Sequence, residues 1–157
     1  SAVFSPDGGT VLTASHDRTA RLWRASDGAP GPVLEGHGDS VLNAVFSPDG
    51  GTVLTASRDA TARLWRASDG APGPVLEGHG EVVWSAVFSP DGGTVLTASH
   101  DRTARLWQAS DGMPLGMIPC DGSLTALAVH DDHMALGDRT GAVHIFRIDW
   151  DRLHASA

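Results

Sequence analysis

Three polar residue types that can form a nucleophilic relay recur at fixed spacing in this sequence. A hydroxyl, an imidazole and a carboxylate are together the groups of a serine hydrolase. An active site contains such a set once, whereas here it repeats together with a tryptophan, which favours a structural role. The sets are His37, Ser57, Asp59 and Trp65; His79, Ser99, Asp101 and Trp107; and, with no upstream histidine, Ser15, Asp17 and Trp23.

Other residues with metal-binding or reactive side chains stand alone. The segment HDDH at residues 130–133 lacks a second ligand cluster and occupies the place of a turn, so we favour a solvated turn. Cys120 is the single cysteine, which forbids an internal disulfide and fits a reducing, cytoplasmic compartment; its apolar neighbours favour a packing role. The PDGG turns precede no helix and the chain has no lysine, which argues against a phosphate loop. We predict no catalytic residue, no metal and no cofactor.

Composition narrows the classes of partner. The formal net charge is −8 at pH 7, which argues against nucleic-acid binding, because such proteins need a basic face. A membrane-spanning helix needs about 18 or more consecutive apolar residues, and the sequence contains no such run. A protein or peptide partner is the remaining expectation.

An internal repeat organises the chain. SAVFSPDGGTVLTASHDRTARLW at residues 1–23 recurs unchanged at residues 85–107, and the copy at residues 43–65 differs at Asn43, Arg58 and Ala60 only. The period is 42 residues, as the step from Trp23 to Trp65 shows (65 − 23 = 42). Each unit predicts four short strands, namely AVFS, TVLTAS, TARLW and PVLEG, separated by Gly, Pro and Asp turns. Four strands in about 42 residues are typical of a propeller blade.

The pattern GH…V…AVFSPDGGTVLTASxDxTARLW resembles the WD40 (WD-repeat) β-propeller family over nearly the whole chain. The resemblance implies an all-β propeller of about four four-stranded blades, in a partial ring or open arc. We place the blades at residues 1–36, 37–78, 79–119 and 120–157. The resemblance also implies that the polar sets form buried networks, in which the indole N–H bonds the serine, the serine bonds the histidine and the histidine bonds the aspartate.

The last unit departs from the repeat. Phe146 stands where tryptophan is expected, Cys120 at the His37 position and Thr140 at the Asp59 position. We expect Trp150–His154 to form its outer strand. The ending GDRTGAVHIF resembles the last blade of bacterial NTPase-associated WD-repeat proteins. The Gly-His segment before each first strand, at Gly36-His37 and Gly78-His79, is called the GH loop. Because the first unit lacks its GH loop, we expect a C-terminal fragment of a longer propeller that self-associates to complete a ring.

The regular copies differ at two short sets of positions. DSVLN at residues 39–43 stands against EVVWS at residues 81–85, and further differences bracket the network aspartate. In the family both sets emerge on the top face around the central channel. Neutral drift is the alternative, but the equally exposed PDGG and ASDGAPGP segments hardly differ, which favours an interaction face. The predicted partner-binding residues are His16, Arg18, Ser40, Leu42, Arg58, Val82, Trp84, His100 and Arg102.

The sequence therefore predicts a non-catalytic scaffold that docks a protein or peptide on the top face. The alternative is a sensor module of a larger bacterial signalling or defence protein with an upstream effector domain. A propeller enzyme is disfavoured, because every polar set is repeated. A purely architectural spacer would tolerate changes at all the variable positions.

Overall fold

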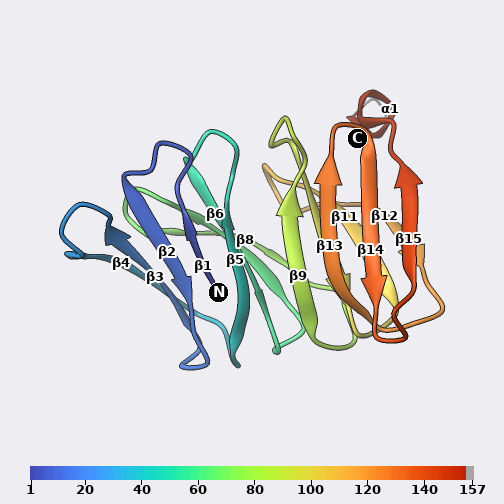
Figure 1. Ribbon diagram of the computed structural model, residues 1–157, viewed down its shortest axis with the longest axis horizontal. Helices are drawn as coiled ribbons and strands as arrows, with labels where there is room; N and C mark the ends of the chain where they lie inside the picture. The colour runs from blue at the N-terminus through green and yellow to red at the C-terminus, as the bar shows by residue number, and fades with distance from the viewer. Residues whose placement is uncertain (155–157) are drawn as a thin grey trace.

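The computed structural model describes residues 1–154, which form four antiparallel sheets side by side (Figure 1). Three sheets have four strands in simple chain order and the last has three. We refer to these sheets as blades 1 to 4. The strands are β1 (Ala2–Phe4), β2 (Thr10–Ala14), β3 (Thr19–Arg24) and β4 (Pro30–Glu35); β5 (Val41–Phe46), β6 (Thr52–Ser57), β7 (Ala62–Arg66) and β8 (Pro72–Leu76); β9 (Val83–Phe88), β10 (Thr94–Ser99), β11 (Thr103–Gln108) and β12 (Pro114–Pro119); and β13 (Leu124–His130), β14 (His133–Asp138) and β15 (Val143–Arg147).

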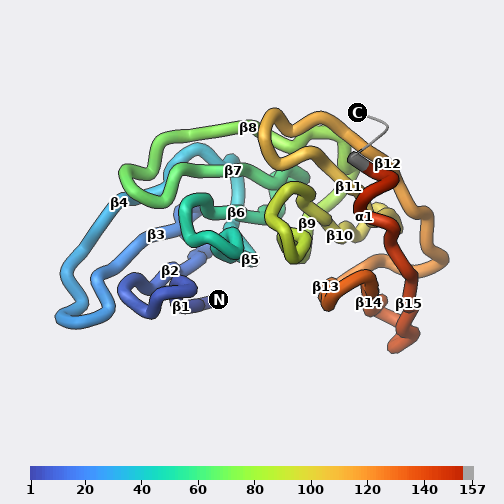
Figure 2. The backbone as a smooth tube through the Cα atoms, turned by 90° about the horizontal axis from the view of Figure 1, so that it is seen from above, coloured from blue at the N-terminus to red at the C-terminus, as the bar shows by residue number. Residues whose placement is uncertain are grey.

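The blades follow one another along an arc, as a propeller requires. Seen from above, β1, β5, β9 and β13 lie on the concave side, while β4, β8 and β12 lie on the convex side (Figure 2). The prediction of an all-β propeller arc is therefore confirmed.

The PDGG segments close the hairpin between the first two strands of each regular blade. In blade 2 the Ser47 hydroxyl donates to Asp49 Oδ1 at 2.6 Å, and the Gly51 N–H donates to the same oxygen at 2.9 Å. Gly50 has a φ of 74°, a left-handed conformation that glycine adopts without steric cost. These contacts help to hold the two strands in register.

The core lies between the blades. At the junction of blades 2 and 3, Leu54 and Leu64 from one sheet pack with Val95 and Trp107 from the next. The junction of blades 1 and 2 uses the equivalent residues one repeat earlier. Since each sheet buries its apolar faces only against a neighbour, the repeats stabilise one another in series.

Blade 4 differs from the sequence prediction at its outer edge. Trp150–His154 forms the short helix α1 rather than a fourth strand. Asp149 is the N-cap of this helix, since its Oδ1 accepts a hydrogen bond from the Arg152 N–H at 3.1 Å. Trp150 and Leu153, three residues apart on one helix face, then pack against the junction of blades 3 and 4.

The HDDH segment forms the turn between β13 and β14. Asp131 and Asp132 lie between the two strands, and Asp131 has a φ of 50°. Within residues 1–154, no group of three or more His, Cys, Asp or Glu side chains is arranged to hold a metal ion. In the same part of the chain, no helix has the length and apolar character needed to cross a membrane.

Truncation of Ile148 should destabilise the end of the array. Its side chain is only 8% exposed and packs between blades 3 and 4. We expect Ile148→Ala to lower the free energy of unfolding by about 2–4 kcal/mol, since it leaves a cavity. The matched control is Met113→Ala, which removes a large side chain that is 59% exposed and should change stability by less than about 0.5 kcal/mol. Denaturant titration measures both, and equal effects would contradict the described packing of blade 4.

Candidate functional site

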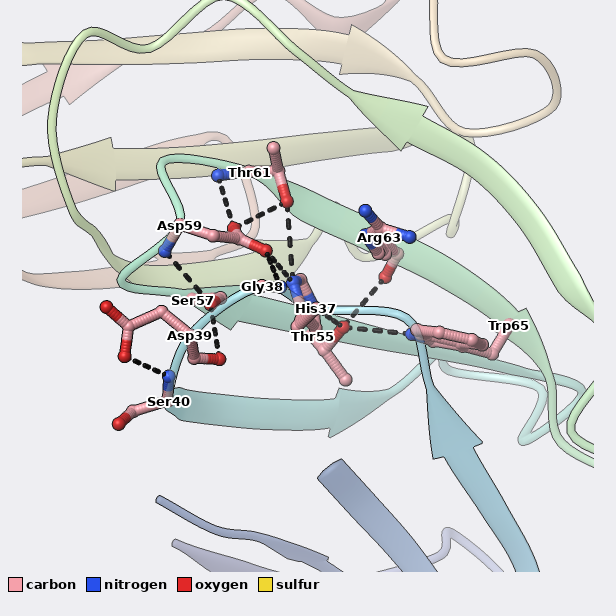
Figure 3. A network of polar contacts seen from close by, with 10 residues as sticks. All are labelled: His37, Gly38, Asp39, Ser40, Thr55, Ser57, Asp59, Thr61, Arg63 and Trp65. Carbon is pink, nitrogen blue, oxygen red and sulfur yellow. Dashed lines mark hydrogen bonds and ion pairs between the residues drawn. The ribbon is translucent and has the colours of Figure 1, made fainter. Parts of the chain in front are cut away.

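Four hydrogen-bonded side chains join the third strand of blade 2 to the loop before its first strand and to the turn between β6 and β7 (Figure 3). The indole Nε1 of Trp65 donates to Thr55 Oγ1 at 2.9 Å. Thr55 Oγ1 lies 2.7 Å from Nε2 of His37, and Nδ1 of His37 lies 2.8 Å from Asp59 Oδ2. Blade 3 repeats the chain with Trp107, Thr97, His79 and Asp101.

The donor and acceptor roles in this network follow from the tryptophan. An indole N–H only donates, so the threonine oxygen accepts it and the threonine hydroxyl is free to donate to histidine Nε2. A neutral imidazole then carries its proton on Nδ1 and donates it to the carboxylate. Every member of the chain is satisfied in this arrangement, which ties the loop before β5 to β6 and β7.

The linking hydroxyl is that of Thr55 and not, as the family resemblance implied, that of Ser57. Trp65 pairs with Val53, and Ser57 lies four residues further along β6, about 13 Å away. Ser57 instead donates to the Asp39 carbonyl at 3.1 Å and accepts the Asp59 N–H at 3.1 Å. The same correction applies to Ser99, replaced by Thr97, and to Ser15, replaced by Thr13. The threonines were missed although they recur in every TAS segment at the same spacing.

The network keeps its carboxylates ionised. Burial raises the pKa of Asp101, but hydrogen bonds from Thr103, His79 and the Gly80 N–H outweigh it and lower the pKa to about 2. Burial likewise raises the pKa of Asp59, and the bonds from His37, Thr61 and the Gly38 N–H hold it below its ordinary value. Burial lowers the pKa of His79, although Asp101 opposes this effect. His79 is therefore neutral at pH 7, in agreement with the direction of its hydrogen bonds.

Among the described residues, no histidine lies beside the aspartate of blade 1. There the Asp17 carboxylate accepts from Arg21 Nη2 at 3.2 Å. In blade 2 His37 contacts the equivalent carboxylate, and Nε of the matching Arg63 is buried without a hydrogen-bond partner among the described residues. Blade 3 has the same HDRTAR sequence as blade 1, yet its Asp101 carboxylate contacts His79 Nδ1 at 2.8 Å, so the residue that the aspartate contacts depends on the histidine.

The glycine of the GH loop is required by space and by backbone conformation. Gly36 has a φ of 150°, and a Cβ there would lie 2.8 Å from Arg63 Nη1 and 3.3 Å from Trp65 Cη2. Gly78 is placed in the same way against Arg105. In the Gly-His dipeptide, the glycine therefore allows the backbone to approach the next strand closely, and the histidine joins the hydrogen-bond network.

Blade 4 has lost the whole network. By strand register, Leu136 occupies the Thr55 position and Phe146 the Trp65 position, so no indole N–H needs an acceptor. Thr140 follows at the Asp59 position and bonds Asp138 Oδ1 at 2.6 Å. A carboxylate–imidazole contact survives elsewhere, between Asp138 and His144 at 3.4 Å.

The assignment of Cys120 to the His37 position needs correction. Four residues separate β12 from β13, against five between β4 and β5. Thr103 pairs with Pro119 as Thr19 pairs with Glu35, so Cys120 follows its strand as Gly36 does. Burial raises the pKa of the Cys120 thiol, and Asp121 and Asp138 raise it further, which agrees with an unreactive packing residue.

Comparison with known proteins decides the family. The family model described as WD domain, G-beta repeat, matches residues 1–24, 28–66 and 70–108, which is more than half of the chain. The chain belongs to the WD40 family. The first match covers β1–β3, the second β4–β7 and the third β8–β11, so the second and third repeats of this WD40 array each begin with the outer strand of the preceding blade. Blade 4 lies beyond the matches. No curated protein matches the chain.

The nine predicted partner-binding residues of this WD40 array lie in the loops before β5 and β9, at the second residue of each of these two strands, and in the turns after β2, β6 and β10. We call this set, His16, Arg18, Ser40, Leu42, Arg58, Val82, Trp84, His100 and Arg102, the variable face. Main-chain hydrogen bonds join its two kinds of segment: the Arg58 N–H donates to the Ser40 carbonyl and the His100 N–H to the Val82 carbonyl, each at 3.0 Å. The Trp84 and His100 rings stack at 5.0 Å with an interplanar angle of 14°.

Two features of the variable segments were not foreseen. The middle turn residues Arg18, Ala60 and Arg102 all have positive φ, between 66° and 72°, which is uncommon without glycine. Asn43, which also differs between copies, has a structural contact, because its Oδ1 accepts the Ala86 N–H of the next blade at 3.2 Å. Arg139 takes the Arg58 position in blade 4, with its N–H on the Ser123 carbonyl at 3.0 Å.

Removal of the linking hydroxyl should cost more in blade 2 than in blade 1. Thr55→Val keeps the side-chain shape but leaves buried Trp65 Nε1 and His37 Nε2 without partners, so we expect a loss of about 1–3 kcal/mol. Thr13→Val is the matched control, because Thr13 accepts from the less buried Trp23 and contacts no histidine among the described residues. Chemical denaturation compares the two, and an equal loss would show that the histidine is not part of the network.

The network should also make stability depend on pH. The His79 pKa is lowered in the folded state from 6.5, so below about pH 6.5 the unfolded chain takes up a proton that the folded chain does not. We therefore expect the free energy of unfolding to fall as pH drops from about 7.5 to 5.5, and Asp101 to add a second loss between about pH 4 and 2.

Denaturant titrations across this pH range measure the slope. His79→Gln should flatten it between about pH 7.5 and 5.5, whereas His130→Gln, in an exposed turn, should not. A slope unchanged by His79→Gln would rule out this source of the pH dependence.

Proposed function

We propose that the chain is a non-catalytic scaffold that docks a protein or peptide on its variable face. WD40 repeats generally mediate protein–protein interactions, and this chain belongs to that family. The observation that best supports this face as the docking site is that its two kinds of variable segment are joined by hydrogen bonds. Residues about 18 positions apart in sequence, such as Ser40 and Arg58, differ between copies and are hydrogen-bonded neighbours in space.

The chemistry of the variable face supports binding. Arg58 is exposed, and Trp84 is partly exposed beside His100. Arginine and tryptophan are the residue types most enriched among those that dominate binding energy. Leu42 takes the Trp84 position in blade 2, so adjacent blades present different apolar side chains on the same backbone.

The buried network argues against a hydrolase function. Thr55 and His37 are buried, and each is fully occupied by its neighbours in the chain of hydrogen bonds. A nucleophile needs access to substrate and a base with a free lone pair. The predicted sensor role in a bacterial signalling protein and the predicted cytoplasmic location remain predictions.

Loss of the Arg58 and Trp84 side chains should strongly reduce partner capture. We expect Arg58→Ala combined with Trp84→Ala to reduce bound partner at least about tenfold, since hot-spot side chains cost about 2 kcal/mol or more each. The measurement is quantitative mass spectrometry of proteins retained by the chain from the native lysate.

The control variant combines Arg66→Ala with Met113→Ala, two exposed side chains outside the variable face. It should retain the same proteins as the unaltered chain. If both double variants lose the same proteins, or neither loses any, the variable face is not the docking site.

A further inference from the structure

The inner strands of blades 2, 3 and 4 each contain a β-bulge at the same place. The pairing of β5 with β6 skips Leu42, and the corresponding pairings of β9 and β13 skip Trp84 and Thr125. A bulge releases its extra residue from the strand ladder and re-aims the side chain. We call this the bulge position. Because its residue differs in all three blades, the sheets present three different side chains from the same backbone irregularity.

The first residue of the turn after each second strand lies beside the bulge position. In blades 2, 3 and 4 its N–H donates to the carbonyl two residues before the bulge residue, at 3.0 Å in each case. In blade 3 the residues at these two positions are Trp84 and His100, whose ring centroids lie 5.0 Å apart in a stack. In blade 2 the same two positions hold Leu42 and Arg58. One blade therefore presents two stacked rings, and its neighbour presents an aliphatic side chain with a guanidinium.

These two pairs of side chains are neighbours in space. Asn43 Oδ1 accepts the Ala86 N–H at 3.2 Å, which joins β5 to β9 one residue beyond Leu42 and two residues beyond Trp84. Blades 2 and 3 also lie side by side within the arc, with a further blade next to each of them (Figure 2). A short extended segment laid across the two inner strands would therefore meet both bulge positions.

The turns of the variable face carry unpaired positive charge. Exposed arginines at the opposite end of the strands form ion pairs, as Arg24 does with Asp27 and Arg66 with Asp69. In contrast, four exposed arginines form no ion pair within residues 1–154, and all four follow the second strand of a blade. They are Arg18, Arg58, Arg102 and Arg139. An exposed guanidinium without a carboxylate is available to bind one from another molecule.

The acidic residues of the same segments make Arg58 the better site for an incoming anion. Asp59 accepts hydrogen bonds from the network histidine and from a backbone N–H, and Asp39 accepts the N–H of the next residue at 2.6 Å. In blade 3 the Glu81 side chain is exposed and forms no hydrogen bond or ion pair within residues 1–154. That free carboxylate competes for Arg102, whereas the carboxylates of blade 2 are held by donors of their own blade.

The opposite end of the strands would repel an acidic partner. The PDGG turns and the ASDG loops join first to second strands and third to fourth strands, so they lie at the end away from the variable face. On a chain of net charge −8, these segments concentrate carboxylates at that end. The residues are Asp7, Asp27, Asp49, Asp69, Asp91 and Asp111.

We propose that the docking partner is a peptide segment that places an acidic side chain on Arg58 and an apolar side chain on Trp84, an inference that rests on the docking function proposed above. The planar guanidinium binds a carboxylate through two parallel hydrogen bonds. Trp84 offers a flat apolar ring that His100 supports from one side, and Leu42 adds apolar surface in blade 2. The turn residue thus selects the charge of the peptide, and the bulge residue selects its apolar side chain.

Selection of random displayed peptides on the purified chain tests this chemistry. Sequencing of the retained peptides should show Asp or Glu enriched at one position, with Phe, Leu, Met or Trp at a fixed distance from it. A fluorescein-labelled copy of a retained peptide should lose at least about tenfold in affinity when its acidic residue is changed to the corresponding amide. Retained peptides without an acidic position, or no retained peptide at all, would overturn the proposal.

Charge reversal tests the assignment of the residues. Arg58→Glu should replace the acidic preference by Lys or Arg at the same peptide position, and it should leave the apolar preference in place. Trp84→Ala should remove the apolar preference and leave the acidic one. An acidic preference that persists in Arg58→Glu, or an apolar preference that persists in Trp84→Ala, would contradict the assignment.

Arg66→Glu is the matched control, because it makes the same change of charge at an exposed arginine at the opposite end of blade 2. Its retained peptides should match those of the unaltered chain, and loss of the acidic preference would show that overall charge rather than Arg58 is responsible. Circular dichroism of each variant must match the unaltered chain. If Trp84→Ala unfolds, Trp84→Thr replaces it with the residue type of the bulge position in blade 4, and the same outcomes apply.

The outcome for the peptide can be told apart from the outcome for docking itself. If Arg58→Ala with Trp84→Ala loses the lysate proteins but the unaltered chain selects no acidic peptide, the variable face docks a partner of different chemistry. If the double variant keeps those proteins, the docking site lies elsewhere and both proposals fail. An oligothymidine that displaces the labelled peptide with equal affinity would show binding of any polyanion, and would overturn a peptide partner.

Discussion

A buried indole N–H must donate a hydrogen bond, and the regular blades of this array are arranged around that requirement. Trp65 and Trp107 fill the junctions between blades, where their rings are almost wholly removed from water. Their nitrogens would be unsatisfied there without the threonine of the neighbouring strand, and the threonine hydroxyl in turn donates a hydrogen bond to the histidine. A series of hydrogen bonds that all point the same way, from tryptophan to threonine to histidine, thus connects the junction to the GH loop. Blade 4 supports this reading, because phenylalanine replaces tryptophan and the other three polar members are gone as well.

This coupling separates a fixed part of each loop from a free part. Gly36 and His37 are held by space and by the network, and Gly38 donates to Asp59 at 2.9 Å. The next residues, from Asp39 onward, are the ones that differ between copies. A loop anchored at its base can vary at its tip without loss of strand register, which is what a binding scaffold with interchangeable contacts needs.

The sequence predicted the repeat, the strands and the order of the blades, because turn residues and apolar alternation recur with one period. It did not predict which hydroxyl meets Trp65. Thr55 and Ser57 lie on the same side of β6, and only the register with β7 distinguishes them. The loop before β13 is one residue shorter than the loop before β5, and the sequence does not show where in the loop that residue is missing. Cys120 was therefore aligned with His37 instead of Gly36. Asp149, an N-cap residue directly before Trp150–His154, indicated a helix there. The repeat pattern predicted a fourth strand instead, and that prediction was wrong.

The middle strands β6 and β10 have the same sequence, TVLTAS, and the segment that contains β2 repeats it as well. Their hairpin partners are also nearly identical, so nothing in these strands distinguishes one blade from another during folding. The correct order therefore comes from chain connectivity, and from blade 4 and α1, which differ from the other three sheets. A strand or a whole blade could consequently be exchanged between two molecules with little loss of contact, and domain swapping is the characteristic misassembly to which this array is exposed.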